Sequence, residues 1–153
     1  MTTEFERYMI LALEQARFAE AIGDVPIGAI VVRDGVVIGS GYNRREADKD
    51  PTAHAEILAI REASKTLGGW RLTGCELYVT IEPCPMCAGA IVMARLDRVV
   101  FGARDIKAGA VASLYQMLQD ERLNHQIDVV EGILETECSM IIKQFFRVLR
   151  KNA

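Results

Sequence analysis

The sequence predicts an α/β fold in which helices cover both faces of a mixed β-sheet. Segments with helical periodicity alternate along the chain with β-branched segments of strand length. The first two strand segments flank Asp34-Gly35, a dipeptide typical of a tight hairpin, so the sheet should begin with an antiparallel pair. The 153 residues contain no repeat or linker, and we expect a single domain spanning residues 1–153.

The N-terminal region is predicted to form a helix followed by the hairpin. Apolar residues recur at helical spacing from Phe5 to Ile22, a capping box of Thr3 and Glu6 precedes them, and Gly23 ends the pattern. The two strands of the hairpin are expected at Ile27–Arg33 and Val36–Tyr42.

A polar loop and a second helix are expected next. Residues Asn43–Ala53 are polar and contain Asp50-Pro51, which favours a loop. Thr52 is predicted to cap a helix that runs from Ala53 to Leu67, where Gly68-Gly69 ends it.

Strands and helices continue to alternate in the second half of the chain. Pro85 suits the first turn of the third helix, because an N–H group at that position has no acceptor within the helix and proline therefore costs no hydrogen bond. Strands are expected at Glu76–Ile81, Arg98–Gly102 and Ile127–Glu131. Helices are expected from Pro85 to about Arg95, at Ser113–Leu118 and at Leu134–Arg150.

Composition excludes several classes of protein. Half of the residues are apolar and a quarter are charged, which is typical of a globular protein and not of a disordered one. No apolar run approaches the roughly 18 residues of a membrane span, and the early acidic residues argue against a secretory signal. We therefore expect a cytoplasmic, reducing location, in which the four cysteines are metal ligands, catalytic groups or buried thiols.

Two short segments carry the residues with metal-binding and catalytic chemistry. They are His54-Ala55-Glu56 and Pro83-Cys84-Pro85-Met86-Cys87, each at the predicted start of a helix. One imidazole and two thiolates are good zinc ligands, and three protein ligands leave the fourth tetrahedral position open for water, as in catalytic sites. The sequence thus predicts Zn²⁺ held by His54, Cys84 and Cys87.

Glu56 is the predicted catalytic residue. It lies two residues from His54, and residues two apart on a helix do not share a face, so its carboxylate should lie beside the ion without binding it. Such a carboxylate can move a proton between water and a substrate nitrogen. The combination of His-x-Glu and Pro-Cys-x-x-Cys is the signature of zinc nucleobase deaminases. A surface histidine with an unrelated Cys-x-x-Cys is the alternative explanation, and it does not account for both segments together.

The chain resembles the bacterial tRNA-specific adenosine deaminases almost from end to end. The Gly-Ala-Arg-Asp-x-Lys segment beginning at Gly102 and the Phe-Phe-Arg tail beginning at Phe145 narrow the resemblance from the deaminase superfamily to the tRNA branch. Further shared segments are Asp24-Val25-Pro26-Ile27-Gly28-Ala29, Gly41-Tyr42-Asn43-Arg44, Asp50-Pro51-Thr52-Ala53 and Glu131-Gly132-Ile133-Leu134. The resemblance implies a three-layer α/β/α cytidine-deaminase-like fold with a mixed five-stranded sheet.

The same resemblance implies an activity, a partner and roles for further residues. The activity is hydrolytic deamination of the wobble adenosine of a tRNA anticodon stem-loop to inosine, by a homodimer. Asn43 would hydrogen-bond the flipped adenine, and Ile27 and Ala53 would line its pocket. Asp105 and Lys107 would hold the flanking nucleotides. Each of these residues also has a purely structural explanation. Asn43 is typical of a turn, Ile27 of a core strand, and Asp105 and Lys107 of a solvated loop.

Two other functions share the zinc motif. The first is deamination of a small molecule such as guanine, cytidine or a pyrimidine nucleotide, because the motif determines the reaction and not the substrate. The second is a catalytically silent, zinc-bearing RNA-binding or assembly subunit, against which Glu56 and the open zinc position argue. A substrate panel and an ammonia assay discriminate among the three.

The net charge of −3 conceals an uneven distribution. A nucleic-acid binder is usually strongly basic, which this chain is not. However, residues 138–153 carry four basic and no acidic side chains, whereas residues 1–137 carry a net charge of −7. We therefore expect a local RNA contact on the closing helix, although the basic residues there also offset the helix dipole. The candidate RNA-contacting residues are Arg44, Lys143, Phe145, Phe146, Arg147 and Arg150.

Overall fold

The computed structural model describes all 153 residues and has the predicted α/β architecture. Four α-helices and a short 3₁₀ helix surround a five-stranded sheet of order β2-β1-β3-β4-β5. The strands are β1 (Gly28–Arg33), β2 (Val36–Tyr42), β3 (Cys75–Ile81), β4 (Arg98–Ala103) and β5 (Asp128–Glu131). The helices are α1 (Glu4–Ala21), α2 (Ala55–Leu67), α3 (Pro85–Ala94), η1 (Met117–Gln119) and α4 (Glu135–Lys151).

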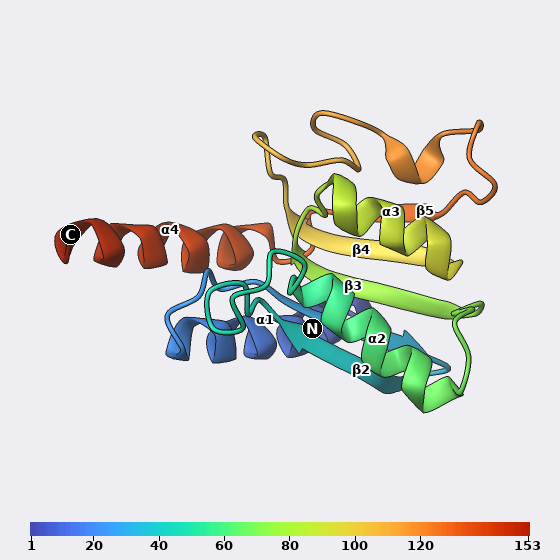
Figure 1. Cartoon of the computed structure of the whole chain (residues 1–153), viewed down its shortest axis with the longest axis horizontal. Coiled ribbons are helices and arrows are strands. Elements are labelled where there is room, and N and C mark those ends of the chain that lie inside the picture. The colour runs from blue at the N-terminus through green and yellow to red at the C-terminus, as the bar shows by residue number, and fades with distance from the viewer.

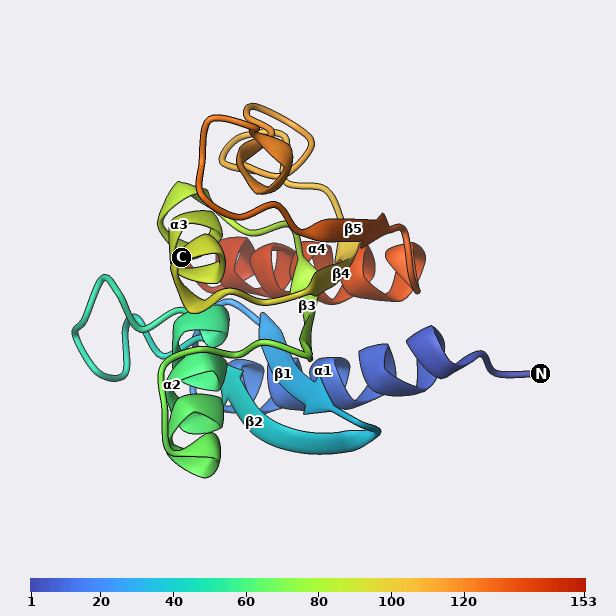
Figure 2. The same ribbon diagram turned by 90° about the vertical axis from the view of Figure 1, so that its right-hand side faces the viewer.

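The sheet is mixed, as the hairpin and the later alternation of strands and helices predict. Strand β1 pairs antiparallel with both β2 and β3, whereas β3–β4 and β4–β5 are parallel. β3 and β4 are connected through α3, and β4 and β5 through a long loop that contains η1, because a parallel crossover needs a long connection. Helices α2 and α3 cover one face of the sheet, and α1 and α4 cover the other (Figures 1 and 2).

Each face of the sheet has its own apolar core. Residues of β1, β3 and β4 alternate between the two, so that Leu77 and Val79 face α2 and α3 while Tyr78 faces α1. Helix α1 begins with the predicted capping box, in which the Thr3 side chain accepts from the Glu6 amide and the Glu6 side chain accepts from the Thr3 amide. None of the helices combines the length and apolar character required of a membrane span.

Close helix–sheet contact depends on glycines in the hairpin. A Cβ at Gly28 would lie 2.0 Å from the Ala12 carbonyl oxygen of α1. On the opposite face, a Cβ at Gly41 would lie 2.5 Å from the Ala55 carbonyl oxygen at the start of α2. Glycine therefore fixes how closely α2, with its N-terminal His54, approaches the sheet.

Two local predictions are wrong. Thr52 does not cap α2, because its amide and hydroxyl both donate to the Asp50 carboxylate, and His54 occupies the N-cap position instead. The helix expected at Ser113–Leu118 is reduced to η1. The Leu114 amide donates to the Gly109 carbonyl and the Met117 amide to the Ala110 carbonyl, so these amides bond the preceding loop and form no i→i−4 helical hydrogen bonds.

Candidate metal centre and active site

Three side chains with metal-binding atoms meet between the N-termini of α2 and α3. His54 is the N-cap of α2, Cys84 is the N-cap of α3, and Cys87 lies in the first turn of α3. The Nδ1 atom of His54 lies 3.7 Å from Sγ of Cys84 and 3.5 Å from Sγ of Cys87. All three ligand atoms lie within 4.8 Å of one another, so the two predicted segments converge on one point.

The spacing of these atoms fits a tetrahedral metal ion. Metal–nitrogen distances of about 2.0–2.1 Å and metal–sulfur distances of about 2.3 Å, at tetrahedral angles, separate nitrogen and sulfur by about 3.6 Å. The two nitrogen–sulfur distances in the structure bracket that value. The group has three protein ligands, so a tetrahedral ion bound here keeps one position for a non-protein ligand.

The ends of the helices provide a favourable electrostatic setting for thiolates. Neither His54 nor Cys84 caps its helix through a side-chain hydrogen bond, which leaves both side chains free to turn toward the ligand group. The hydrogen bond with the Cys87 thiol, and to a lesser extent that with His54, lowers the pKa of Cys84 to about 4. The Cys84–Cys87 hydrogen bond in turn raises the pKa of Cys87. The hydrogen bond with Cys84 raises the pKa of His54. The positive end of the α3 dipole further favours negative sulfur.

Glu56 lies in the first turn of α2, beside the ligand group. It is only 3% exposed, and this burial raises the pKa of its carboxyl to about 7. A carboxyl with a pKa near neutrality can both accept and donate a proton, which is the property required of a proton shuttle. The structure therefore places a titratable acid next to a metal-binding group, as the spacing of His54 and Glu56 predicts.

The residues expected around the base lie in the loop between β2 and α2 and before β1. Asn43 is buried; its Nδ2 donates to the Val25 carbonyl and its Oδ1 accepts from the Arg45 amide. Its amide thus shapes the turn, and one N–H and one lone pair remain. Ala53 is buried, and Ile27 is partly buried against the α2–α3 core.

Asp105 and Lys107 lie in the loop that follows β4. The Asp105 carboxylate accepts from the Lys107 and Ala108 amides, and the Lys107 side chain is exposed. Arg44 is bound within the protein: it pairs with Asp48 at 3.0 Å and stacks on the Tyr42 ring.

The sequence analysis missed one buried acid close to the ligand group. Glu82 is 2% exposed and lies two residues before Cys84. Its carboxylate accepts four backbone N–H groups and the Ser113 hydroxyl. An acidic residue directly after an apolar strand is the only sequence signal of this role, because the donors lie 23 to 31 residues away.

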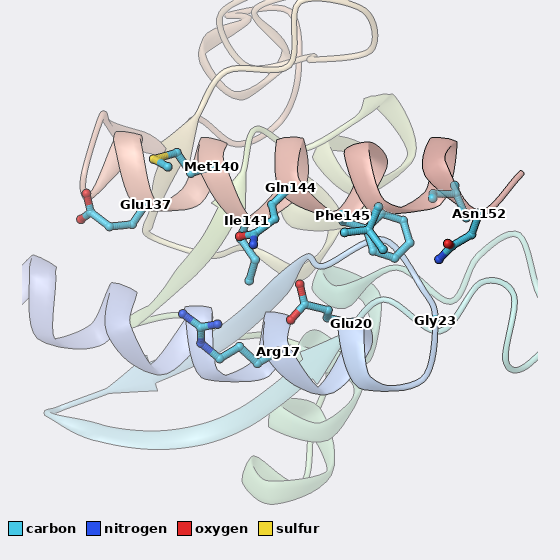
Figure 3. A pocket seen from close by; sticks show the side chains of 11 residues that line it. Arg17, Glu20, Gly23, Glu137, Met140, Ile141, Gln144, Phe145 and Asn152 are labelled. Atoms are coloured by element: carbon cyan, nitrogen blue, oxygen red, sulfur yellow. The ribbon is translucent and has the colours of Figure 1, made fainter.

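The candidate RNA-contacting residues of α4 lie on more than one face of the helix. A groove of about 650 Å³ separates α4 from α1, and Ile141, Phe145 and Val148 are among its lining residues (Figure 3). Of the six candidates, only Phe145 lines the groove. Lys143, Phe146, Arg147 and Arg150 are exposed elsewhere on α4. The groove belongs to the α1–α4 layer. Figure 2 shows this layer on the other face of the sheet from α2 and α3, whose N-terminal ends carry the ligand group.

Comparisons with known proteins agree with this geometry. The family model of MafB19-like deaminases matches residues 3–150. A tRNA-specific adenosine deaminase of Bacillus subtilis is 53% identical over 150 residues, covering 98% of this chain and 93% of the relative. A tRNA-specific adenosine deaminase of Haemophilus influenzae is 46% identical and covers 96% of this chain and 86% of the relative.

Solved structures give the same result for the fold. A structure from a study of A-to-I editing by tRNA:A34 deaminases at the wobble position of transfer RNA superposes with a TM-score of 0.85. It is 47% identical, and the match covers 88% of this chain and 98% of that one. A guanine deaminase from Nitrosomonas europaea superposes with a TM-score of 0.81 at 26% identity, covering 95% of this chain and 85% of that one. One fold therefore serves relatives with different substrates.

Proposed function

The chain belongs to the family of tRNA-specific adenosine deaminases, and we propose that it converts the wobble adenosine of a tRNA anticodon to inosine at the centre formed by His54, Glu56, Cys84 and Cys87. The observation that carries this proposal is the convergence of three ligand atoms with one buried carboxyl, between two helix N-termini. Sequence identity of 53% and 46% to two tRNA-specific adenosine deaminases, over nearly the whole chain, supports the choice of substrate.

We propose Zn²⁺ as the resident ion. Its preference for one imidazole and two thiolates in tetrahedral geometry agrees with the donor set and spacing of His54, Cys84 and Cys87. When bound, zinc lowers the pKa of a coordinated water toward 7 and so makes a nucleophile available at neutral pH.

Glu56 would move the protons of the reaction. Its carboxylate takes a proton from the attacking water and delivers it to N1 of adenine as the hydroxyl adds to C6. The second proton leaves the new C6 hydroxyl and passes through the same carboxyl to the exocyclic amine; the C6–N bond then breaks, and the oxygen remains as the C6 carbonyl. The sum is adenosine and water converted to inosine and ammonia. Burial of Glu56 supports this role, because it keeps the carboxyl near the pKa that two-way transfer requires.

The base would be held by the loop before α2. A target base must leave its stack to reach a recessed site, and the anticodon loop is single-stranded, which lowers that cost. Asn43 retains one N–H and one lone pair with which to bind the edge of the adenine. Ala53 and Ile27 would supply apolar walls.

The flanking RNA would lie along Asp105, Lys107, Arg44 and α4. Exposed Lys143, Arg147 and Arg150 provide positive charge, and Phe146 provides an aromatic ring that is 37% exposed. Phe145 packs edge-on against Phe146 and would hold that ring in place. This arrangement supports a local, salt-sensitive contact with RNA.

We also propose that residues 1–153 form one domain that acts as a homodimer in the cytoplasm. One continuous sheet supports a single domain. The α3 helix is almost wholly apolar, and its Met93 is 69% exposed, which suits a subunit interface. All four cysteines are free, as expected in a reducing compartment. Sedimentation as a monomer at micromolar concentration would contradict the dimer.

The direct test is incubation of the zinc-loaded protein with an anticodon stem-loop that carries a wobble adenosine. We expect inosine at that position and equimolar ammonia, measured by nucleoside mass spectrometry. A stem-loop with cytidine at the wobble position is the matched control and should not change. RNA binding without ammonia release would instead identify a non-catalytic subunit.

Deamination of a free base or nucleoside is the second candidate function, because a guanine deaminase shares the fold. The same assay with free guanine, adenosine and cytidine separates the two candidates. Turnover of a free compound with no change in the stem-loop would contradict the proposed substrate.

A further inference from the structure

We propose that Glu82 is a positioning residue, which fixes the RNA-contacting loop 104–113 to the turn that carries the metal ligand Cys84. The inference rests on the proposed function, in which Asp105 and Lys107 of this loop contact the anticodon. The juxtaposition of Glu82 with Cys84 in sequence, and with Asp105 and Ser113 in space, is the basis of the proposal.

The Glu82 carboxylate is enclosed by the loop. Its Oε1 accepts from the Asp105 amide at 3.0 Å and from the Ser113 hydroxyl. Its Oε2 accepts from the amides of Val111, Ala112 and Ser113, at 3.1, 2.8 and 2.8 Å. The two ends of the loop are thereby held by the two oxygens of one side chain.

No cation pairs with this buried carboxylate; the five donors are all uncharged. Burying a carboxylate is costly unless hydrogen bonds replace its hydration, so a full set of donors is needed to keep it in place. Hydrogen bonds to a charged acceptor are about twice as strong as neutral ones. The loop therefore has one strongly preferred position, set by Glu82.

Gly109 makes this enclosure possible. A Cβ at position 109 would lie 2.3 Å from the Glu82 carboxyl carbon and 2.4 Å from each of its oxygens. Only a residue without a side chain allows the loop to pass so close to the carboxylate.

The same loop is also tied to the backbone beside the metal ligand. The Ala110 amide donates to the Pro83 carbonyl at 2.9 Å, and the Glu82 amide donates to the Ala103 carbonyl at 2.8 Å. Glu82 and Pro83 thus connect the loop that carries Asp105 to Cys84, which follows them directly in the chain. Glu82 itself has no atom in the ligand group, so it acts on the reaction by placing Asp105 and Lys107 relative to that group.

Glu82→Gln tests the role with a side chain of nearly the same shape. The amide oxygen can keep the three amides of residues 111–113, and the Ser113 hydroxyl can rotate to accept from the amide nitrogen. The Asp105 amide then faces another donor and loses its partner. We expect KM for the anticodon stem-loop to rise about tenfold, with kcat within about threefold of wild type and one zinc per chain.

Two further variants make the test specific. Glu121→Gln makes the same substitution at an exposed acid outside this loop, and we expect its KM to stay within about twofold of wild type. Gly109→Ala changes no charge but displaces the loop from the carboxylate, and it should raise KM as Glu82→Gln does. A variant with a merely weakened fold would instead lose melting temperature and zinc together, with KM unchanged.

Hydrogen exchange measured by mass spectrometry separates this inference from the proposed function. In Glu82→Gln, amides 105–108 should exchange faster than in wild type, whether or not the wild type deaminates RNA. Unchanged exchange in both Glu82→Gln and Gly109→Ala, or a KM of Glu82→Gln equal to that of Glu121→Gln, would overturn the inference. If the wild type deaminates the stem-loop but exchange is unchanged in the variants, the proposed function stands and the role of Glu82 is wrong. If the wild type is inactive but exchange is faster in the variants, Glu82 holds the loop and the proposed function is wrong.

Discussion

At the scale of single residues, the proposed chemistry depends on Glu56 as a proton carrier and not as a metal ligand. We expect Glu56→Ala to keep the fold and the zinc but to lower kcat by about 10²–10⁴-fold, the usual contribution of general acid–base catalysis. Steady-state deamination and zinc content by atomic absorption measure the two effects. Glu62→Ala, which removes an exposed acid from the same helix, should behave as wild type. Wild-type turnover in Glu56→Ala would exclude the shuttle role.

The two histidines allow a matched test of the ligand assignment. His54→Ala removes one of three ligands and should abolish stoichiometric zinc binding. His125→Ala should retain zinc, because the imidazole of His125 bonds the Leu96 carbonyl and lies outside the ligand group. Zinc bound per chain after dialysis is the measurement. Full occupancy in His54→Ala would contradict the assignment.

At this scale, the sequence predicts which side chains lie together wherever local spacing determines their placement. His54 and Glu56, like Cys84 and Cys87, are separated by two or three positions, so helix geometry relates their side chains. Glu82 could not be recognised in this way, because its partners belong to a loop that only the folded sheet brings near. Asn43 is intermediate: its position at a strand end was visible, but its bond to Val25 was not.

At the scale of elements, the close packing of α2 on the hairpin places the N-cap His54. Gly41→Ala would push a methyl group into the Ala55 carbonyl and the Ala59 amide of α2. We expect a loss of about 1–3 kcal/mol in the free energy of unfolding, as is usual for overpacking, and weaker zinc binding because His54 shifts with its helix. Urea unfolding and competition with a zinc chelator measure these effects.

Gly69 provides the control for this substitution. It follows the end of α2, and a Cβ there would meet no atom within 4 Å. Gly69→Ala should therefore leave stability and zinc affinity unchanged or slightly improved. Equal losses in the two variants would show that the effect does not arise from helix–sheet contact.

The elements themselves could be predicted wherever periodicity and caps agree. The β2 bounds and the capping box of α1 are both found as expected. The helix predicted at Ser113–Leu118 was wrong because the Leu114 and Met117 amides bond the carbonyls of Gly109 and Ala110, in a loop whose residues 111–113 are held by Glu82, 29 to 31 residues away. Long-range polar contacts thus override local propensity in the loop that we propose to contact RNA.

At the scale of the whole molecule, the layered fold separates the metal-binding group from the α1–α4 groove. The group lies where α2 and α3 begin, and the C-terminal half of α4 extends past the sheet at the same end of the molecule (Figure 1). Seven residues of α4 line the groove toward α1, and Lys143, Arg147 and Arg150 are not among them. The basic side chains therefore face away from α1, which leaves them available to a partner.

A contact between RNA and the basic side chains of α4, as proposed above, would reconcile a net charge of −3 with an RNA substrate. Charge reversal in Arg147→Glu/Arg150→Glu should raise Kd for the stem-loop at least about tenfold near 100 mM salt and make its salt dependence shallower, because fewer counterions are released. Zinc content should not change. Lys65→Glu/Arg71→Glu makes the same change in net charge at the other end of α2. If both double variants weaken binding equally, only net charge matters; if neither does, α4 is not an RNA contact. Loss confined to the α4 variant would show that Arg147 and Arg150 of α4 contact the RNA.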